Sequence, residues 1–117
     1  MGVVTVVFTV TAAVVFAVAG AMKITGHPMS LKTRDRLGVS PGRWRSIGVL
    51  ELCGVAGALI GLAYPPLGIA ALTGLLLLSI GALGFHVGKR DPLQEAAPAV
   101  FAFLVTIAAL ALQIATA

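Results

Sequence analysis

The chain has 117 residues, of which 59% are hydrophobic and only 10% are charged, and its formal net charge is +4. Soluble domains carry about 25% charged residues, so this composition leaves too little polar surface for a water-soluble fold and predicts a polytopic membrane protein. The basic residues flank apolar segments, where they act as topology signals and as contacts for anionic lipid. The positive charge therefore does not indicate a nucleic-acid partner.

Four apolar segments, each about the length of one membrane crossing, make up most of the chain. An α-helix rises about 1.5 Å per residue and needs about 20 residues to cross a hydrocarbon core of about 30 Å. The segments cover residues 3–22, 46–64, 67–86 and 99–115. They predict one all-α domain over residues 1–117, an up-down bundle of four transmembrane helices.

The first segment is predicted to be a retained span. A cleaved signal peptide carries its basic residues before the apolar run, whereas here Lys23 and a basic loop follow it. The loop, residues 23–45, holds six of the eight Lys and Arg residues. Within it, Ser30 as an N-cap and Gly38 as a terminator predict a short basic helix over 31–37 that lies at the membrane interface.

The start of the second long helix is marked by Ser40 and Pro41, an N-cap residue followed by proline at the first helical position. Trp44 comes one turn later, between Arg43 and Arg45. Tryptophan is enriched at the membrane–water interface. We therefore expect these three side chains to anchor the helix at the level of the lipid headgroups.

The distribution of charge predicts the orientation. The last two basic residues, Lys89 and Arg90, follow the third segment, whereas the turn at Pro65 and Pro66 carries no charge. With four spans, the first and third gaps lie on the same side, and the positive-inside rule makes that side cytoplasmic. We expect loops 23–45 and 87–98 in the cytoplasm and both termini outside it.

Polar residues within the spans predict which face of each helix points inward, because they must find partners within the protein. At about 100° per residue, each lies on a stripe made mostly of small residues. The stripes are Lys23 with Ala19, Phe16, Ala12 and Thr5; Glu51 with Gly48, Gly54 and Ala58; His86 with Ala82, Ser79 and Leu75; and Gln113 with Ala109, Thr106 and Ala102. We expect all four stripes to face the interior of the bundle, with Gln113 bonding between helices.

Glycines supply a second packing signal, since small residues let helix backbones approach closely. Gly48 and Gly54 share the stripe of Glu51 and are expected to pack against a neighbouring helix. Gly74, Gly81 and Gly88 form a separate stripe at intervals of seven residues. That stripe predicts a close helix–helix contact, either within the bundle or between two protomers.

Three ionisable residues, Lys23, Glu51 and His86, fall at similar depth near the cytoplasmic end and form the candidate site. Glu51 lies about 10 Å below the headgroups, where a carboxylate is costly unless it is paired or protonated. Glu51 is therefore either functional or neutralised by a structural partner such as Lys23 or Arg45. His86 is suited to bind a ligand, to move a proton or to hydrogen-bond at the interface. One cysteine and two histidines lack the number and spacing of a zinc or haem site, so no metal site is predicted.

These residues carry a resemblance to a known family. Gly20-Ala21-Met22-Lys23, Gly48-Val49-Leu50-Glu51-Leu52, and Gly81-Ala82 followed by His86 and then Pro98 are similar to the motifs of the DoxX-like family of four-helix membrane proteins. The resemblance extends from about Ala19 to Leu112. It implies a bacterial inner-membrane protein, and it singles out Lys23, Glu51 and His86. Some relatives are linked to quinone-coupled sulfur oxidation or to membrane redox complexes, and more distant ones assemble membrane proteins.

Three functions are compatible with these features. The first is an accessory subunit of a membrane redox complex, not an enzyme on its own, whose cluster of Lys23, Glu51 and His86 binds a quinone or lipid or passes a proton. No covalently bound cofactor is expected, and electrons would come from a partner protein. The second is an assembly factor or scaffold that engages another membrane protein or a second copy of itself. A small proton-coupled transporter ranks last, because exporters of that type need near-balanced loop charge and here all eight basic residues lie on one side.

Overall fold

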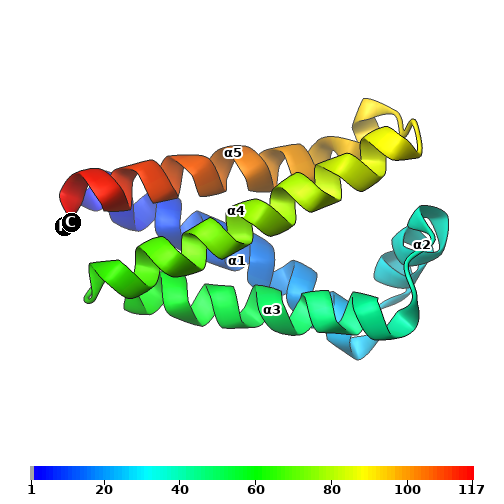
Figure 1. The fold of residues 1–117 in the computed structure, drawn as a ribbon, viewed down its shortest axis with the longest axis horizontal. Coiled ribbons are helices and arrows are strands. Elements are labelled where there is room, and N and C mark those ends of the chain that lie inside the picture. The colour runs from blue at the N-terminus through cyan, green and yellow to red at the C-terminus, as the bar shows by residue number, and fades with distance from the viewer. Residues whose placement is uncertain (1) are drawn as a thin grey trace.

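Residues 2–117 are described by the computed structural model, and they form five helices joined by short turns (Figure 1). No strand occurs within these residues. The helices are α1 (Val3–Thr25), α2 (Pro28–Leu37), α3 (Pro41–Ile60), α4 (Pro65–Gly88) and α5 (Leu93–Thr116). The all-α prediction is confirmed, including the short helix in the first loop.

The four long helices pack side by side in alternating directions. α1 packs against α3 and α5, and α4 packs against the same two helices, so each long helix has two long neighbours. The start of α1 and the end of α5 lie at one end of the bundle with the turn between α3 and α4, and α2 lies at the other end with the turn between α4 and α5 (Figure 1). The bundle is 40 Å along its longest axis.

Three of the long helices, α1, α4 and α5, are long and apolar enough to cross a membrane. The protein is therefore a membrane protein, and the predicted first, third and fourth spans are supported. α3 differs because its 20 residues include Arg43, Arg45 and Glu51. The second of the four predicted spans accordingly stays a prediction.

The structure moves the start of α2 three residues upstream of the predicted helix. Pro28 is its first residue, and the Nδ1 atom of His27 accepts a hydrogen bond from the backbone N–H of Met29 at 3.2 Å. The N-cap is thus His27, and Ser30 lies inside the helix with another role. Gly38 ends α2 as predicted, with a φ of 73° that glycine adopts without strain.

The predicted start of α3 is confirmed. The hydroxyl of Ser40 accepts a hydrogen bond from the backbone N–H of Arg43 at 3.4 Å, and Pro41 is the first helical residue. Ser40 thus accepts a hydrogen bond from one of the free N–H groups of the first turn. Pro41 has no backbone N–H that would need a partner.

The last loop is shorter than predicted, residues 89–92 instead of 87–98. α5 begins at Leu93, and Pro98 lies within the helix. Apolar sequence marks where a helix enters hydrocarbon, but the helix itself begins earlier, because polar residues such as Gln94 and Glu95 are well suited to an exposed first turn. Pro98 is the sixth residue of α5 and removes the backbone donor that would bond to the carbonyl of Gln94.

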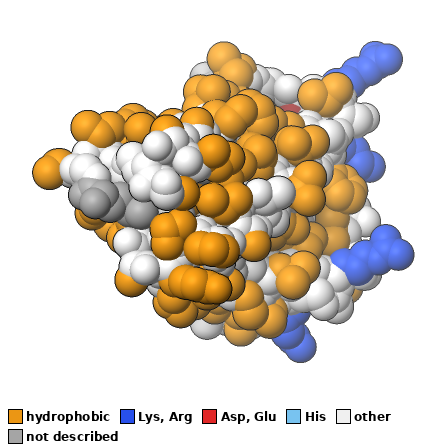
Figure 2. All heavy atoms as spheres, turned by 60° about the vertical axis from the view of Figure 1, so that its left-hand side comes forward, with side chains coloured by type: hydrophobic (Ala, Val, Ile, Leu, Met, Phe, Trp, Pro, Cys, Tyr) orange, Lys and Arg blue, Asp and Glu red, His pale blue; other side chains and the backbone are white. Residues whose placement is uncertain are grey.

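The predicted inward stripes are confirmed on all four long helices. Their buried members are Thr5, Ala12 and Phe16 on α1; Gly48, Glu51 and Ala58 on α3; Leu75, Ser79 and His86 on α4; and Ala102, Thr106, Ala109 and Gln113 on α5. Larger aliphatic side chains cover the outside of the bundle, as expected for a surface in contact with lipid. On the face shown in Figure 2, hydrophobic side chains cover the sides and the Lys and Arg side chains gather at one end.

Gly74, Gly81 and Gly88 lie on the outside of α4. A Cβ atom added at any of the three would meet no atom within 4 Å. Of the two contacts that the sequence left open, the one within the bundle is therefore not formed, because all three glycines are exposed. A contact between protomers remains a prediction.

Candidate functional site

Two glycines allow Lys23 and Glu51 to meet. A Cβ on Gly20 would lie 2.9 Å from the carbonyl oxygen of Gly48, and a Cβ on Gly48 would lie 2.9 Å from that of Gly20, so α1 and α3 touch through their backbones here. Each charged residue follows its glycine by three positions and so lies on nearly the same face of its helix. Side chains lean toward the N-terminus of their own helix. Because α1 and α3 run in opposite directions, the two side chains lean toward each other.

The resulting ion pair is nearly enclosed. Lys23 Nζ lies 2.8 Å from Glu51 Oε1, and the two side chains are 15% and 5% exposed. The Nζ atom also lies 4.8 Å from the centre of the Trp44 ring, within cation–π range. Of the two partners predicted for Glu51, the structure pairs it with Lys23.

Trp44 packs against the ion pair of Lys23 and Glu51 on the side of α2. Its Nε1 donates a hydrogen bond to the Ser30 hydroxyl at 2.8 Å, and the residue is 8% exposed. The ring therefore packs between α3 and α2, while Arg43 and Arg45 on either side are exposed. Trp44 thus has a buried hydrogen-bond partner on α2, and its depth relative to the lipid headgroups stays a prediction.

His86 belongs to a separate cluster. Its Nδ1 lies 2.6 Å from Asp91 Oδ2, and Arg36 donates to Asp91 and to Glu95, each at 3.1 Å. This network ties α2 to the turn between α4 and α5. Within residues 2–117, no hydrogen bond or ion pair joins His86 to the cluster of Lys23 and Glu51. The structure therefore brings together two of the three predicted site residues.

Sequence reasoning missed Asp91 and Arg36. A signal was present, since Asp91 and Glu95 are two of only four acidic residues and lie four positions apart. The hydrogen bond from His86, with the hydrogen bond and charge of Arg36, holds the pKa of the Asp91 carboxyl below its usual value of 3.8. The ionised carboxylate is thus the form that holds α2 in place.

The attachment of α2 is expected to fail in acid. Because the pKa of Asp91 in the folded protein lies below 3.8, the stabilisation that it provides is complete above that pH and is lost as the pH falls further. Trp44 is the only tryptophan and bonds to α2, so its fluorescence reports the attachment. We expect its emission to shift toward longer wavelength below about pH 3.8 in the wild type, and to be shifted already at pH 7 in Asp91→Asn.

Asp35→Asn is the matched control, since Asp35 pairs with its neighbour Arg34 on the surface of α2. That variant should keep the emission of the wild type at pH 7 and its acid transition. An Asp91→Asn protein with an unchanged transition would contradict the role of Asp91.

Gln113 organises the opposite half of the bundle. It is fully buried, and its Nε2 donates to the Thr9 hydroxyl at 3.1 Å and to the Ala58 carbonyl at 3.3 Å. These bonds join α5 to α1 and α3, which confirms the prediction of an interhelical hydrogen bond.

Two cavities open on the surface of the bundle. One is a groove of about 530 Å³ between α3 and α4, and the other, of about 460 Å³, lies between the end of α2 and the end of α4. Lys23, Glu51 and His86 line neither of them. Among the residues that the structure describes, no three His, Cys, Asp or Glu side chains gather where they could hold a metal ion.

The comparisons with known proteins identify one match. The sequence model of the DoxX-like family matches residues 7–109. The match includes Lys23, Glu51 and His86 and ends before Gln113. No curated protein and no solved structure matches the chain.

Proposed function

The chain belongs to the DoxX-like family, and from that premise we propose that it is an accessory subunit of a membrane redox complex that holds the apolar chain of a quinone or lipid. The groove between α3 and α4 is the observation that carries the proposal. The proposal requires that α3 cross the membrane with the other three long helices, so that the groove opens toward lipid.

The composition of α3 is compatible with a crossing. Arg43 and Arg45 lie in its first two turns and are exposed, where they can reach lipid headgroups. The remaining charge, Glu51, is matched by Lys23 at 2.8 Å. The bundle length of 40 Å exceeds the roughly 30 Å of a hydrocarbon core, so four crossings fit.

With four crossings, the end that carries α2 faces the cytoplasm and both chain ends face outward. All eight Lys and Arg residues lie in α2, in the last turn of α1, in the first two turns of α3 or in the turn after α4, as the positive-inside rule requires. We place the protein in the inner membrane of a bacterium. Alkaline phosphatase fused after Ala117 is expected to be active, because it folds only outside the cytoplasm, and an inactive, stably produced fusion would reverse the orientation.

The groove has the shape and chemistry for a flexible apolar chain. It is formed by small or aliphatic residues and one thiol: Leu50, Cys53, Gly54, Gly57, Leu67, Ala70, Ala71, Gly74, Leu75, Leu77 and Leu78. Its volume of about 530 Å³ is within the range of ligand sites. No charged side chain lines it, which favours an isoprenoid or acyl chain over a polar ring.

The ion pair of Lys23 and Glu51 then has a positioning role. It fixes α3 against α1 beside the tight glycine contact, while the opposite side of α3 faces the groove with Leu50 and Cys53. A ligand in the groove would not touch the pair. Glu51 therefore acts on the site through the placement of α3.

Filling the groove tests the proposal. A Cβ at Gly74 meets no atom within 4 Å, so Gly74→Leu adds bulk to the groove without overpacking the bundle. We expect native mass spectrometry of the protein extracted in mild detergent to show a bound quinone or lipid that Gly74→Leu loses at least tenfold. Gly42→Leu is the control that should keep the ligand, because Gly42 is equally open on α3 and lines neither cavity.

A wild-type protein without an apolar ligand, or a Gly74→Leu protein that keeps it, would contradict the proposal. A bundle that carries another membrane protein in place of a small molecule would favour an assembly factor.

A further inference from the structure

A trough of glycines runs along the cytoplasmic half of α4. Gly81, Gly84 and Gly88 follow one another at helical spacing, and a Cβ at any of them would meet no atom within 4 Å. They form one wall of the cavity of about 460 Å³. From Gly81 to Gly88 the helix rises about 10 Å, which is comparable to the distance from a lipid phosphate into the first part of an acyl chain.

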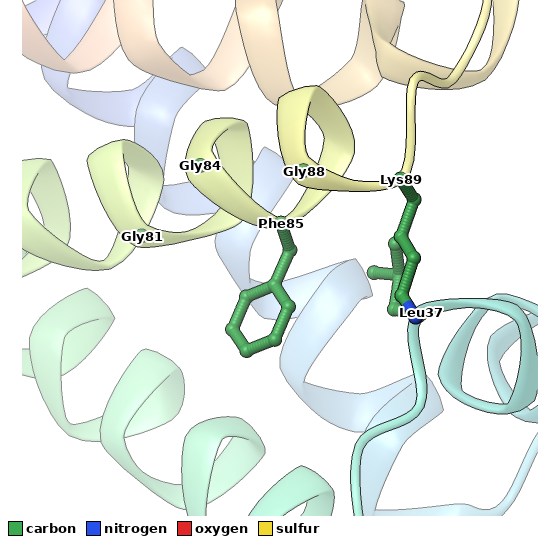
Figure 3. Close-up of a pocket in the computed structure, with 6 residues that line it drawn as sticks. All are labelled: Leu37, Gly81, Gly84, Phe85, Gly88 and Lys89. Atoms are coloured by element: carbon green, nitrogen blue, oxygen red, sulfur yellow. The ribbon is translucent and has the colours of Figure 1, made fainter.

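The two ends of the trough differ in chemistry. Figure 3 shows the Phe85 ring projecting from α4 beside Gly81 and Gly84, and Lys89 reaching from the end of α4 to Leu37 of α2. The deeper part is thus apolar, whereas the part nearest α2 carries an ammonium group. A ligand that fills both needs an alkyl chain at one end and an anion at the other.

Among the residues that the structure describes, Lys89 has no ion-pair partner. Each of the four acidic residues has a basic partner: Glu51 pairs with Lys23, Asp35 with Arg34, and both Asp91 and Glu95 with Arg36. In residues 2–117, the basic side chains without an ion pair are Lys32, Arg43, Arg45, Lys89 and Arg90. Of these, Lys89 lines the cavity at the end of α4.

We propose that this trough binds one anionic phospholipid, with its phosphate at Lys89 and the upper part of an acyl chain along the glycines beside Phe85. The lipid would bridge α2 and α4 at Leu37. The inference depends on the membrane placement proposed above but not on a ligand in the groove between α3 and α4.

Lipid titration followed by native mass spectrometry of the full chain tests the site. The probes are phosphatidylglycerol and phosphatidylcholine with the same acyl chains, added to delipidated protein in detergent. A basic residue near the membrane surface strengthens binding of anionic lipid by about fivefold. We expect the wild type to bind phosphatidylglycerol about fivefold more tightly than phosphatidylcholine, and Lys89→Gln to lose that preference.

Arg90→Gln is the charge-matched control, because Arg90 is the next residue and lines neither of the two cavities described above. It should keep the preference. An equal loss in both variants would show diffuse attraction instead of a site and would overturn the proposal, as would equal binding of the two lipids by the wild type.

Gly84→Leu and Gly74→Leu separate this site from the groove. Gly84→Leu should weaken phosphatidylglycerol binding by blocking the trough, and Gly74→Leu should leave it unchanged. Unchanged binding in a folded Gly84→Leu protein would overturn the proposal. If that variant does not fold, the comparison of Lys89→Gln with Arg90→Gln decides.

Discussion

Glu51→Ala is expected to lower the free energy of unfolding by about 3 kcal/mol, because it leaves the Lys23 ammonium enclosed without its counter-charge. The Lys23 side chain is only 15% exposed and lies against the Trp44 ring. It can recover little hydration unless α1 and α3 separate. Lys23→Ala should destabilise by a similar amount, since it leaves the carboxylate of Glu51, 5% exposed, in the same position.

The double variant Lys23→Met/Glu51→Leu distinguishes a structural pair from a functional one. Replacing both charges with apolar side chains of similar size removes the desolvation cost of both, so its stability should return to within about 1 kcal/mol of the wild type. The measurement is unfolding by sodium dodecyl sulfate in mixed micelles, followed by circular dichroism. Single variants as stable as the wild type, or no recovery in the double variant, would contradict the pairing role.

Glu51→Gln tests whether the carboxylate of Glu51 transfers a proton or only positions α3. It keeps the size of the side chain and removes its charge. If Glu51 only positions α3, the variant should lose stability in parallel with ligand retention in the groove. If the proposed redox complex is isolated, a Glu51→Gln protein of normal stability that abolishes its activity would instead assign proton transfer to the carboxylate.

The inward faces of the long helices could be predicted from the sequence because one physical rule dominates within a membrane. Polar groups such as Glu51 and Gln113 must face protein, and helical spacing then fixes which neighbours share that face. The N-cap at Ser40 was predictable for a similar reason, since capping depends on a few adjacent residues.

The arrangement around α2 could not be predicted in this way, because contacts between distant residues determine it. The hydrogen bond from Trp44 to Ser30 and the pairing of Arg36 with Asp91, 55 positions away, appear only when the helices are packed. His86 bonds to Asp91, five positions later, because the short turn of residues 89–92 brings that carboxylate back over the end of α4. A loop of the predicted length, 87–98, would not have required this contact.

Gly68→Ala is expected to destabilise the protein by about 3 kcal/mol, near the upper end of what overpacking usually costs. α3, α4 and α5 meet at this position in the half of the bundle opposite α2. A Cβ on Gly68 would lie 2.6 Å from the Cα of Gly61 and would overlap Oε1 of Gln113. Neither obstacle moves easily, since one is backbone and the other belongs to an amide held by hydrogen bonds to Thr9 and Ala58.

Gly74→Ala is the control for Gly68→Ala, because it makes the same chemical change less than two turns later on the open side of α4. Alanine has the higher helix propensity, so this variant should match the wild type or exceed its stability by about 0.5–1 kcal/mol. Unfolding in mixed micelles measures both variants under the same conditions. A Gly68→Ala protein as stable as Gly74→Ala would mean that the helices separate at this point at little cost, and that Gln113 does not hold them in close contact.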